Sequence, residues 1–580
     1  VTPKPGARRF AVEMRVAHPQ AGIADFAMPE WMPGYYRLIH YSQYVSGFEA
    51  RDGQGRALGW EQVTPDTWRV VTGSAAALTL RYQVAASRPF AADNSIADDR
   101  AFIAPPGMYL YPRGHLDQPV QVALALPPQW SSVATGLDPV RGQAHAFTAP
   151  NYDVLFDSPM LLGNQEQLHF TVQGVPHDIA LQDVPASVDR AKMTSDLKRI
   201  VVAATTLMGT IPYDRYTFLL MGRGNGGIEH LNSMAAEFNG NQMATPEQYQ
   251  RWLSYIAHEY FHNFNVKRIR PLALGPFDYE AENRTGMLWV SEGLTVYYED
   301  LLLVRAGLIT PRQYLDTLQA AITKFENEPG RPYQSAVESS WTTWGTSGVG
   351  GDRGTTISYY DNGGILGAML DLAIRHGSRN ARSLDDVMRT LYRTYALVQH
   401  RGFTDAEFRA ACEQAAGAPL GDLFSYAATT VPYDYTKYFA YAGLEVARTP
   451  APPSAAPAGG WLGLATDASI PPPGTSPRAA PQPLSVAAVA DASPAAQAGI
   501  RAGDRIFEIN AAAATTAALS AFVEKGKPGD TAQISYGGSS ARQTVAVVLA
   551  PPQRWSYTIQ PSAAPAAAAS ALLADWLRQH

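Results

Sequence analysis

The sequence predicts a chain of several domains: an N-terminal antiparallel β domain, an α+β domain with a helical C-terminal part, and a small β domain near the C-terminus. Its 580 residues exceed the size that one hydrophobic core usually serves, so three or more domains are expected. The hydrophobic pattern changes from a period of two to a helical period near residue 185. A Pro/Ala-rich linker at 447–460 marks a further change in composition.

The N-terminal β domain is predicted at 1–175. Short apolar stretches such as "ALTLRYQVAA" and "PVQVALALP" alternate there with clusters of Pro, Gly and Asp. Period-two patterning with frequent turn residues is typical of antiparallel strands, so we expect a sandwich or a barrel-like domain.

The α+β domain is predicted at 176–446. "VDRAKMTSDLKRIVVAATTLMG" has a helical pattern that ends at Gly209, and "TFLLMGRGNGG" predicts a strand that runs into a glycine-rich turn. A helix should start at Thr245, because Pro follows this N-cap and Gln stands three residues after it. We expect that helix to continue to about Lys267.

Three further helix signals follow. "LWVSEGLTVYYEDLLLVRAG" predicts a helix that Gly307 closes. Capping boxes at Ser383 to Asp386 and at Thr404 to Glu407 predict two more helix starts. Beyond the linker, we expect a β-rich unit at 460–550 and an Ala/Pro-rich tail at 551–580. The tail should end in a short amphipathic helix that docks through Leu572, Leu573 and Trp576.

Composition excludes several classes of function. The net charge of −6 is small for this length and argues against a nucleic-acid-binding surface. No run of 18 or more apolar residues appears, so no membrane span is expected. The single cysteine, Cys412, excludes an intramolecular disulfide and a cysteine-based metal site. The opening Val1-Thr2-Pro3 fits a mature exported protein or a trimmed chain, and we expect a periplasmic or secreted location.

The stretch "YIAHEYFHN" contains His-Glu-x-x-His on a predicted helix. Residues i and i+4 of a helix lie about 40° apart around its axis and about 6 Å apart along it, so His258 and His262 can bind one metal ion. Glu259 would then lie beside that ion, where it can reach a water molecule. The alternative is an exposed helix face that carries two histidines.

Glu292, in "LWVSEGLTVYY", is the predicted third ligand. It lies among apolar residues on the next strong helix, and a carboxylate in such surroundings needs a partner. Two histidines and one glutamate form the ligand set of a hydrolytic zinc site. The acidic residues at 278, 280 and 282 lie in a loop-like segment and are worse candidates. Glu299 is either an acceptor behind a ligand histidine or part of a solvated surface pair with Asp300.

These motifs resemble the glycyl aminopeptidase family of gluzincin zinc metallopeptidases, and more distantly aminopeptidase N. The resemblance rests on "HEYFHNFNVKRIRP" and "LWVSEGLTVYYEDLL", with 29 residues between His262 and Glu292. It implies a thermolysin-like fold for 176–446 and one Zn2+ per chain. It also implies a zinc metallo-aminopeptidase that removes small N-terminal residues, glycine and then alanine, from peptides with a free N-terminus.

The resemblance assigns further site residues. In "GRGNGGIEHLNS", Gly226, Gly227 and Glu229 match the edge strand on which such enzymes bind substrate, and Glu229 would receive the substrate ammonium. His230 stands where the relatives have Asn. A surface glutamate on a strand is the alternative for Glu229.

In "TISYYDNGGILGAMLDL", Tyr360 matches the tyrosine that stabilises the developing oxyanion, and Tyr359 is the adjacent alternative. Glu259 would be the general base that takes a proton from zinc-bound water and passes it to the leaving amine. The glycine-rich stretch at 345–356 is interpreted as a mobile wall of the cleft or simply as a long loop.

Residues 460–550 resemble a PDZ domain. "SPAAQAG" and "GDRIFEIN" match its helix start and a strand, and "GWLGL" matches the loop that receives a chain-terminal carboxylate. A peptide C-terminus is therefore the candidate ligand, although a proline-rich insert at 469–483 could close the groove. A packing module with a closed groove is the alternative.

Two other functions fit the same residues. In a zinc endopeptidase with PDZ-mediated substrate binding, Glu229 would be dispensable and N-terminally blocked peptides would be cut. In a PDZ scaffold with a vestigial metal site, the general base Glu259 would not be needed. The presence of Glu259 therefore argues against this hypothesis.

Overall fold

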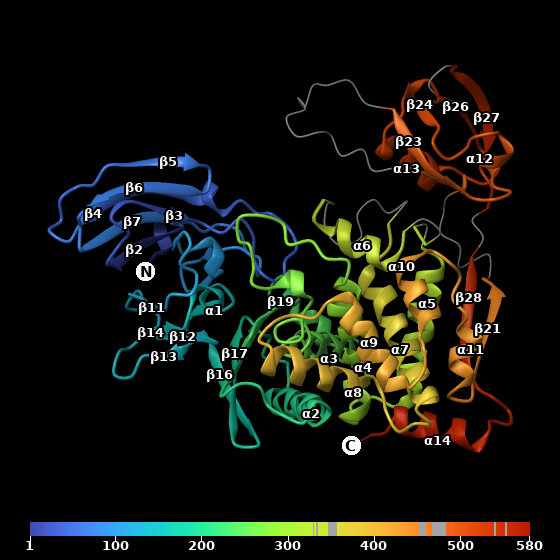
Figure 1. Ribbon diagram of the computed structural model, residues 1–580, viewed down its shortest axis with the longest axis horizontal. Helices are drawn as coiled ribbons and strands as arrows, with labels where there is room; N and C mark the ends of the chain where they lie inside the picture. The colour runs from blue at the N-terminus through green and yellow to red at the C-terminus, as the bar shows by residue number, and fades with distance from the viewer. Residues whose placement is uncertain are drawn as a thin grey trace.

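The computed structural model describes residues 1–328, 330–331, 334–345, 356–451, 460–466, 483–538, 541–551 and 554–579. A β-rich N-terminal region adjoins a largely helical body, and a small C-terminal domain stands apart from both (Figure 1). Among the described residues, no helix combines the length and the apolar character that a membrane crossing requires.

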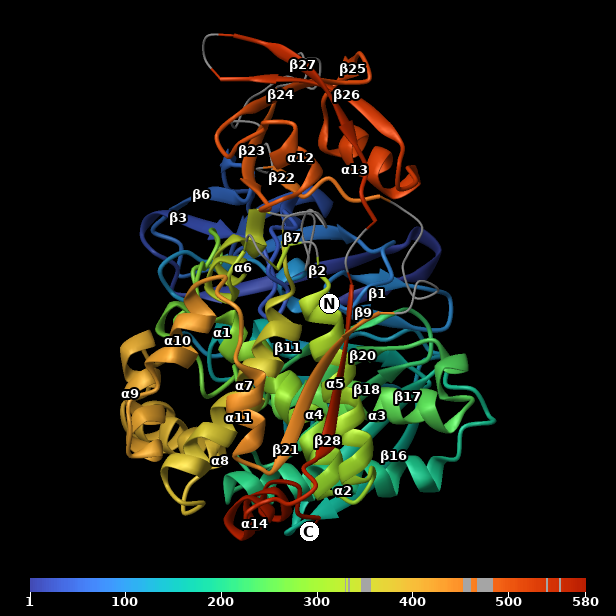
Figure 2. The same ribbon diagram turned by 90° about the vertical axis from the view of Figure 1, so that its right-hand side faces the viewer.

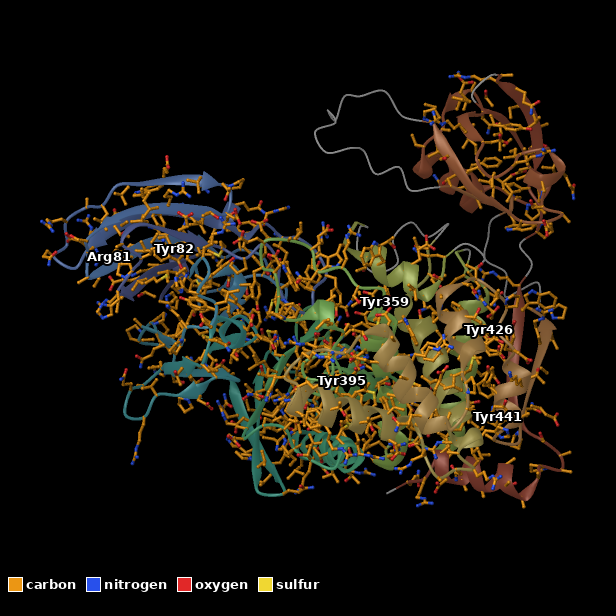
Figure 3. All side chains as sticks on the ribbon, in the orientation of Figure 1. Arg81, Tyr82, Tyr359, Tyr395, Tyr426 and Tyr441 are labelled. Atoms are coloured by element: carbon orange, nitrogen blue, oxygen red, sulfur yellow. The ribbon has the colours of Figure 1, made fainter. Side chains whose placement is uncertain are left out.

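The N-terminal region contains the predicted antiparallel sandwich. One four-stranded sheet has the order β1 (Thr2–Lys4), β2 (Arg9–Ala17), β7 (Ala77–Ala85), β4 (Val45–Asp52). The other has the order β10 (Tyr111–Pro112), β3 (Gly22–Ala27), β6 (Thr67–Gly73), β5 (Trp60–Thr64). Their inner faces share one core. Arg81 and Tyr82, both labelled in Figure 3, show the alternation on β7: Tyr82 is buried, whereas Arg81 pairs with Glu13 at the surface.

Two smaller sheets and a short helix, α1 (Tyr152–Phe156), complete this region. One sheet consists of β11 (Val120–Ala123), β14 (Ala146–Ala149) and β13 (Asp138–Pro139). The other consists of β12 (Ser132–Thr135), β15 (Met160–Gly163), β9 (Ala101–Ile103) and β8 (Ser95–Ile96). The antiparallel β domain is therefore confirmed.

The predicted boundary after residue 175 falls inside a hairpin. Strand β16 (Glu166–Val172) pairs with β17 (Val175–Gln182), and both belong to the sheet of the next region. The boundary between the N-terminal β domain and the α+β domain therefore lies between β15 and β16. The period-two pattern could not reveal this, because a hairpin has the same alternation whichever sheet it joins.

The sheet of the α+β region has the order β16, β17, β18 (Tyr216–Met221), β20 (Ser233–Glu237), β19 (Gly226–Glu229). All six residues of β18 are buried, because it runs through the centre of the sheet, parallel to both neighbours. Strand β19 is antiparallel to β20 and forms an edge of the sheet.

The helical body begins with α2 (Arg190–Met208), which Gly209 ends in a left-handed conformation as predicted. It continues with α3 (Pro246–Phe261), a π-helical turn at Trp289–Gly293, α4 (Leu294–Arg305), α5 (Pro311–Glu326), α6 (Ala336–Thr342), α7 (Tyr359–Gly377), α8 (Leu384–Leu391), α9 (Asp405–Ala416), α10 (Gly421–Ala428) and α11 (Tyr435–Ala440). The capping boxes predicted at Ser383 and Thr404 are present, and the helix start predicted at Thr245 also has a capping box.

Helix α3 is shorter than predicted and ends at Phe261 instead of near Lys267. The chain turns away over the next residues, and Val266 has a φ of +109° that no helix contains. The turn brings the amide of Asn265 to the carbonyls of Val290 and Ser291, both at 2.9 Å. These two bonds connect the end of α3 to the π-helical turn.

The C-terminal domain has its own core and matches the predicted PDZ module. Its sheet has the order β22 (Leu464–Thr466), β23 (Leu484–Val489), β24 (Arg505–Ile509), β26 (Thr531–Gly537), β27 (Gln543–Val548), with β25 (Ala512–Ala513) paired to β24. Its helices are α12 (Pro494–Gln497) and α13 (Thr516–Lys525). The proline-rich insert at 469–483 lies, except for its last residue, outside the described residues.

The predicted linker and tail are partly wrong. Strand β21 (Leu444–Pro450) pairs along its whole length with β28 (Trp555–Pro561), so the chain returns to the helical body after the PDZ domain. This ribbon packs on α5, to which the Tyr557 and Ile559 amides donate hydrogen bonds (Figures 1 and 2). Most side chains of β21 are exposed, which explains why its sequence lacks the alternation of a half-buried strand.

The predicted terminal helix is present as α14 (Ala567–Trp576). Leu572 and Trp576 are buried and Leu573 is half-buried, as the docking prediction requires. The indole N–H of Trp576 donates to the Tyr297 hydroxyl at 2.9 Å, so the last helix is part of the body that contains α4.

Candidate active site

The structure brings together the three predicted metal ligands. His258 and His262 lie on successive turns at the end of α3, and their Nε2 atoms are 2.9 Å apart. Oε2 of Glu292 lies 3.1 Å from Nε2 of His262 and 3.6 Å from Nε2 of His258. No other group of three or more such side chains among the described residues could hold a metal ion.

The hydrogen-bond partners of the two Nδ1 atoms indicate what kind of ligand the three side chains can bind. Nδ1 of His258 lies 2.7 Å from Oε2 of Glu299, and Nδ1 of His262 lies 2.7 Å from the carbonyl oxygen of Asn265. Both partners accept, so each Nδ1 donates its hydrogen and each Nε2 is left with a lone pair. Two lone pairs and a carboxylate then converge, an arrangement that a cation between them would satisfy. The residues therefore fit a divalent metal ion.

Glu292 owes its position to a close contact between two helices. It lies in the π-helical turn before α4, and Gly293 packs against Gly363 of α7. A Cβ atom on Gly293 would lie 2.3 Å from the Gly363 Cα, so only glycine allows this approach. Turns of π-helix are frequent at functional sites, and no local pattern in the sequence indicated this one.

The electrostatics of the site follow from burial and from neighbouring charges. Burial opposes ionisation of Glu292, but His262 and His258 overcome it and hold the pKa of Glu292 well below its usual range. Burial raises the pKa of Glu259 to about 7, although both histidines lower it. Burial also raises the pKa of Glu299, and its hydrogen bond with His258 opposes that rise.

Strand β19 lies against Glu259. A Cβ atom on Gly227 would lie 2.4 Å from the Tyr255 hydroxyl and 2.8 Å from Oε1 of Glu259. The absence of a side chain therefore lets the backbone of this edge strand approach the predicted base. Gly226, with a φ of +108°, precedes it in a conformation that favours glycine.

Glu229 ends β19 and is buried. Its Oε1 atom has no hydrogen-bond partner among the described residues, and the ammonium of Lys267 lies 3.5 Å away. The hydrogen bond of Lys267 goes from its Nζ to Oδ1 of Asp157, at 2.9 Å. The same carboxylate also accepts a hydrogen bond from Nδ1 of His230. A buried carboxylate oxygen that makes no hydrogen bond can still accept one from a ligand.

One cavity reaches the ligand His258, and a second cavity lies at Glu229. The first, of about 440 Å³, is lined by His258, Glu259, Tyr255 and Tyr360 among others. The second, of about 230 Å³, is lined by Glu229, Lys267 and Arg270, together with Gly34 and Tyr36 of the N-terminal domain.

Tyr360 and Tyr359 begin α7 and point to different surroundings. The Tyr360 ring stacks 6.0 Å from the ring of His258. Tyr359, labelled in Figure 3, is buried, and its hydroxyl lies 3.3 Å from Oγ1 of Thr343. Only Tyr360 of the two lines the cavity that His258 and Glu259 share. Most of the glycine-rich stretch at 345–356, predicted to form a cleft wall, lies outside the described residues.

One residue of the site was not predicted from the sequence. The hydroxyl of Tyr36, from the N-terminal domain, donates to Oε1 of Glu292 at 2.7 Å. Tyr36 lies 256 positions before Glu292 and belongs to no motif, so no local signal could have identified it.

Comparisons with known proteins match three regions of the chain. The Peptidase M61 N-terminal domain matches residues 1–164, the M61 glycyl aminopeptidase domain matches 251–366, and a PDZ domain matches 474–549. A crystal structure of an aminopeptidase N family protein from Idiomarina loihiensis is similar, with 27% identity, coverage of 98% of both chains and a TM-score of 0.76.

A variant of the M1 zinc metallopeptidase from Deinococcus radiodurans, bound to a Tyr-Ser-Ala substrate, is more distant. It has 14% identity, the match covers 75% of this chain and 93% of that chain, and the TM-score is 0.48. A search of curated protein sequences found no match.

The fold and the converging ligands define a metallopeptidase, and the chain is therefore a hydrolase of peptide bonds. Its N-terminal region resembles the M61 N-terminal domain, its peptidase region resembles the M61 glycyl aminopeptidase domain, and a PDZ domain follows.

Proposed function

We propose that the chain is a zinc-dependent aminopeptidase that removes small N-terminal residues, glycine and then alanine, from peptides. The observation that carries this proposal is the convergence of two imidazole lone pairs and the Glu292 carboxylate. A hydrogen bond on the side away from the metal site orients each of these three groups. Two histidines and one glutamate are a zinc donor set in hydrolytic sites. When bound, zinc would polarise the scissile carbonyl and make an attacking water more acidic.

Glu259 is proposed as the general base. Its carboxylate is buried beside the ligand histidines, and burial raises its pKa to about 7. A carboxylate with this pKa can accept a proton from the attacking water and pass it to the leaving amine near neutral pH. Tyr360, which stacks on His258, is proposed to donate its hydroxyl hydrogen to the developing oxyanion.

Glu229 is proposed to bind the free amino terminus of the substrate. Its buried Oε1, which makes no hydrogen bond and lies 3.5 Å from the Lys267 ammonium, can accept a charge-assisted hydrogen bond from a substrate ammonium group. Glu229 lines the cavity of about 230 Å³, whose other walls include Gly34 and Tyr36 of the N-terminal domain, and this small volume suits a short terminal residue. These features support an exopeptidase with a preference for small first residues.

The decisive experiment compares glycyl, alanyl and leucyl anilides with their N-acetylated forms, with and without a chelator. We expect turnover of free glycyl and alanyl substrates only, and its loss when the metal is removed. Glu259→Gln should keep the metal and lose turnover by a factor of about 10² to 10⁴. Equal cleavage of acetylated substrates would instead support the endopeptidase, and a fully active Glu259→Gln would refute the proposed base.

We also propose that the PDZ domain binds a peptide C-terminus. Within the described residues, β22 lies at an edge of its sheet, and an edge strand can accept an added strand. Titration of the full chain with a fluorescent peptide, free and amidated at its C-terminus, tests this. Binding that is insensitive to amidation would refute carboxylate recognition.

A further inference from the structure

The segment at 30–36 of the N-terminal domain enters the peptidase domain. The Glu30 amide donates to the Tyr279 carbonyl at 2.8 Å, and the indole N–H of Trp31 donates to the Asp278 carbonyl at 2.9 Å. The fully buried Trp31 ring packs edge-on against Phe277 at 5.2 Å. The segment is therefore fixed to the peptidase domain by hydrogen bonds and by packing.

This segment meets the predicted substrate anchor at Gly34. A Cβ atom there would lie 2.8 Å from both carboxylate oxygens of Glu229, and the φ of +89° favours glycine. Two residues later, Tyr36 reaches Glu292. The N-terminal domain thus contacts both acidic residues that the proposed reaction requires on this side of the site.

The two oxygens of Glu292 have separate partners. Oε2 faces the Nε2 atoms of His262 and His258, whereas Oε1 accepts the hydrogen bond from the Tyr36 hydroxyl at 2.7 Å. Glu292 is buried, and the Tyr36 ring is itself held beside the ring of Trp344, 6.1 Å away. A carboxylate held at one oxygen keeps its other oxygen in a fixed direction.

We infer that Tyr36 is a positioning residue for Glu292, by which the N-terminal β domain completes the metal centre of the peptidase domain. The inference rests on the proposed zinc site. Tyr36 fixes the rotation of the carboxylate, so that Oε2 is presented to the ion while Oε1 is occupied. The N-terminal domain therefore contributes a residue to the metal site, in addition to packing beside it.

The test is zinc affinity of the full chain, measured by competition with a chromophoric chelator. Tyr36→Phe removes one hydroxyl and keeps the ring. We expect it to weaken zinc binding about 10- to 100-fold, the usual effect of losing a hydrogen bond behind a ligand. Tyr35→Phe is the matched control, because the Tyr35 ring packs on Phe90, and it should bind zinc like the parent.

A double-mutant cycle with Glu292→Gln shows whether Tyr36 acts through Glu292. We expect Tyr36→Phe to change zinc affinity less than about twofold in the Glu292→Gln background, since the two effects should not add. Equal losses in both backgrounds, or unchanged affinity of Tyr36→Phe in the parent background, would overturn the inference. A parent chain that binds no zinc would refute the proposed zinc site itself. A parent chain that binds zinc, with a Tyr36→Phe variant of equal affinity, would refute only the role of Tyr36.

Discussion

Nδ1 of His258 and Oε2 of Glu299 lie 2.7 Å apart and join helix α3 to helix α4. The histidine is one of the predicted metal ligands, and the carboxylate fixes both its ring orientation and its tautomer. We expect Glu299→Gln to weaken zinc binding about tenfold, because a neutral amide is a weaker acceptor. Chelator competition measures this. Asp300→Asn is the control, since Asp300 binds Ser254 instead, and an equal loss in that variant would contradict the assignment.

The glycine at position 227 should be needed for turnover but not for metal binding. Gly227→Ala would bring a methyl group to 2.8 Å from Oε1 of Glu259, so the base or the edge strand has to move. Displacement of a catalytic group by about 1 Å can cost about a hundredfold in rate. Steady-state kinetics should show a lower kcat with unchanged zinc affinity. Gly6→Ala, which meets no atom within 4 Å, is the control.

The tyrosines that begin α7 should differ in their effects. Tyr360→Phe removes the proposed oxyanion donor, and kcat should fall by about 10² to 10³. Tyr359→Phe removes a hydroxyl that faces Thr343, and kcat should change little. The opposite ranking would assign the role to Tyr359.

The C-terminal helix should stabilise the peptidase domain. Trp576 is fully buried and bonded to Tyr297, so Trp576→Ala should cost about 3–5 kcal/mol. Thermal unfolding of the full chain measures this as a fall in the midpoint. Arg578→Ala, at an exposed ion pair, should leave the midpoint nearly unchanged, and equal midpoints for all three proteins would show that α14 does not stabilise the domain.

His177 should make the protein less stable in acid. It is buried between the Tyr213 hydroxyl, 2.9 Å from Nε2, and the Val175 carbonyl, and burial lowers its pKa from 6.5 to about 4. The unfolded chain therefore takes up a proton that the folded chain excludes. The stability present above pH 6.5 is lost as the pH falls toward 4, by on the order of 3 kcal/mol.

Thermal midpoints of the parent and of His177→Gln between pH 7 and pH 4 check this. The midpoint of the variant should fall less over that interval, since its amide does not titrate. Parallel curves would show that His177 does not contribute to the loss.

Local signals in the sequence predicted the core of the site. Helical periodicity alone places His258 and His262 one turn apart, and the apolar residues around Glu292 mark it as a carboxylate that needs a partner. The capping box at Thr245 likewise located the start of the helix that holds both histidines.

Other features depend on contacts between distant segments. Tyr36 reaches Glu292 only because the N-terminal domain packs on the peptidase domain. Strand β28 exists because it pairs with β21, from which the PDZ domain separates it in sequence. The early end of α3 follows from the bonds of Asn265 to the π-helical turn. Propensity and period carry no information about such pairings.

Zinc stoichiometry is the strictest test of the proposed metal site. The purified chain should bind one zinc ion, measured by chelator competition together with elemental analysis. Single replacements His258→Ala, His262→Ala and Glu292→Ala should each abolish tight binding, whereas His230→Ala should retain one ion per chain. A parent chain without bound metal, or a Glu292→Ala variant that binds zinc as tightly as the parent, would contradict the account.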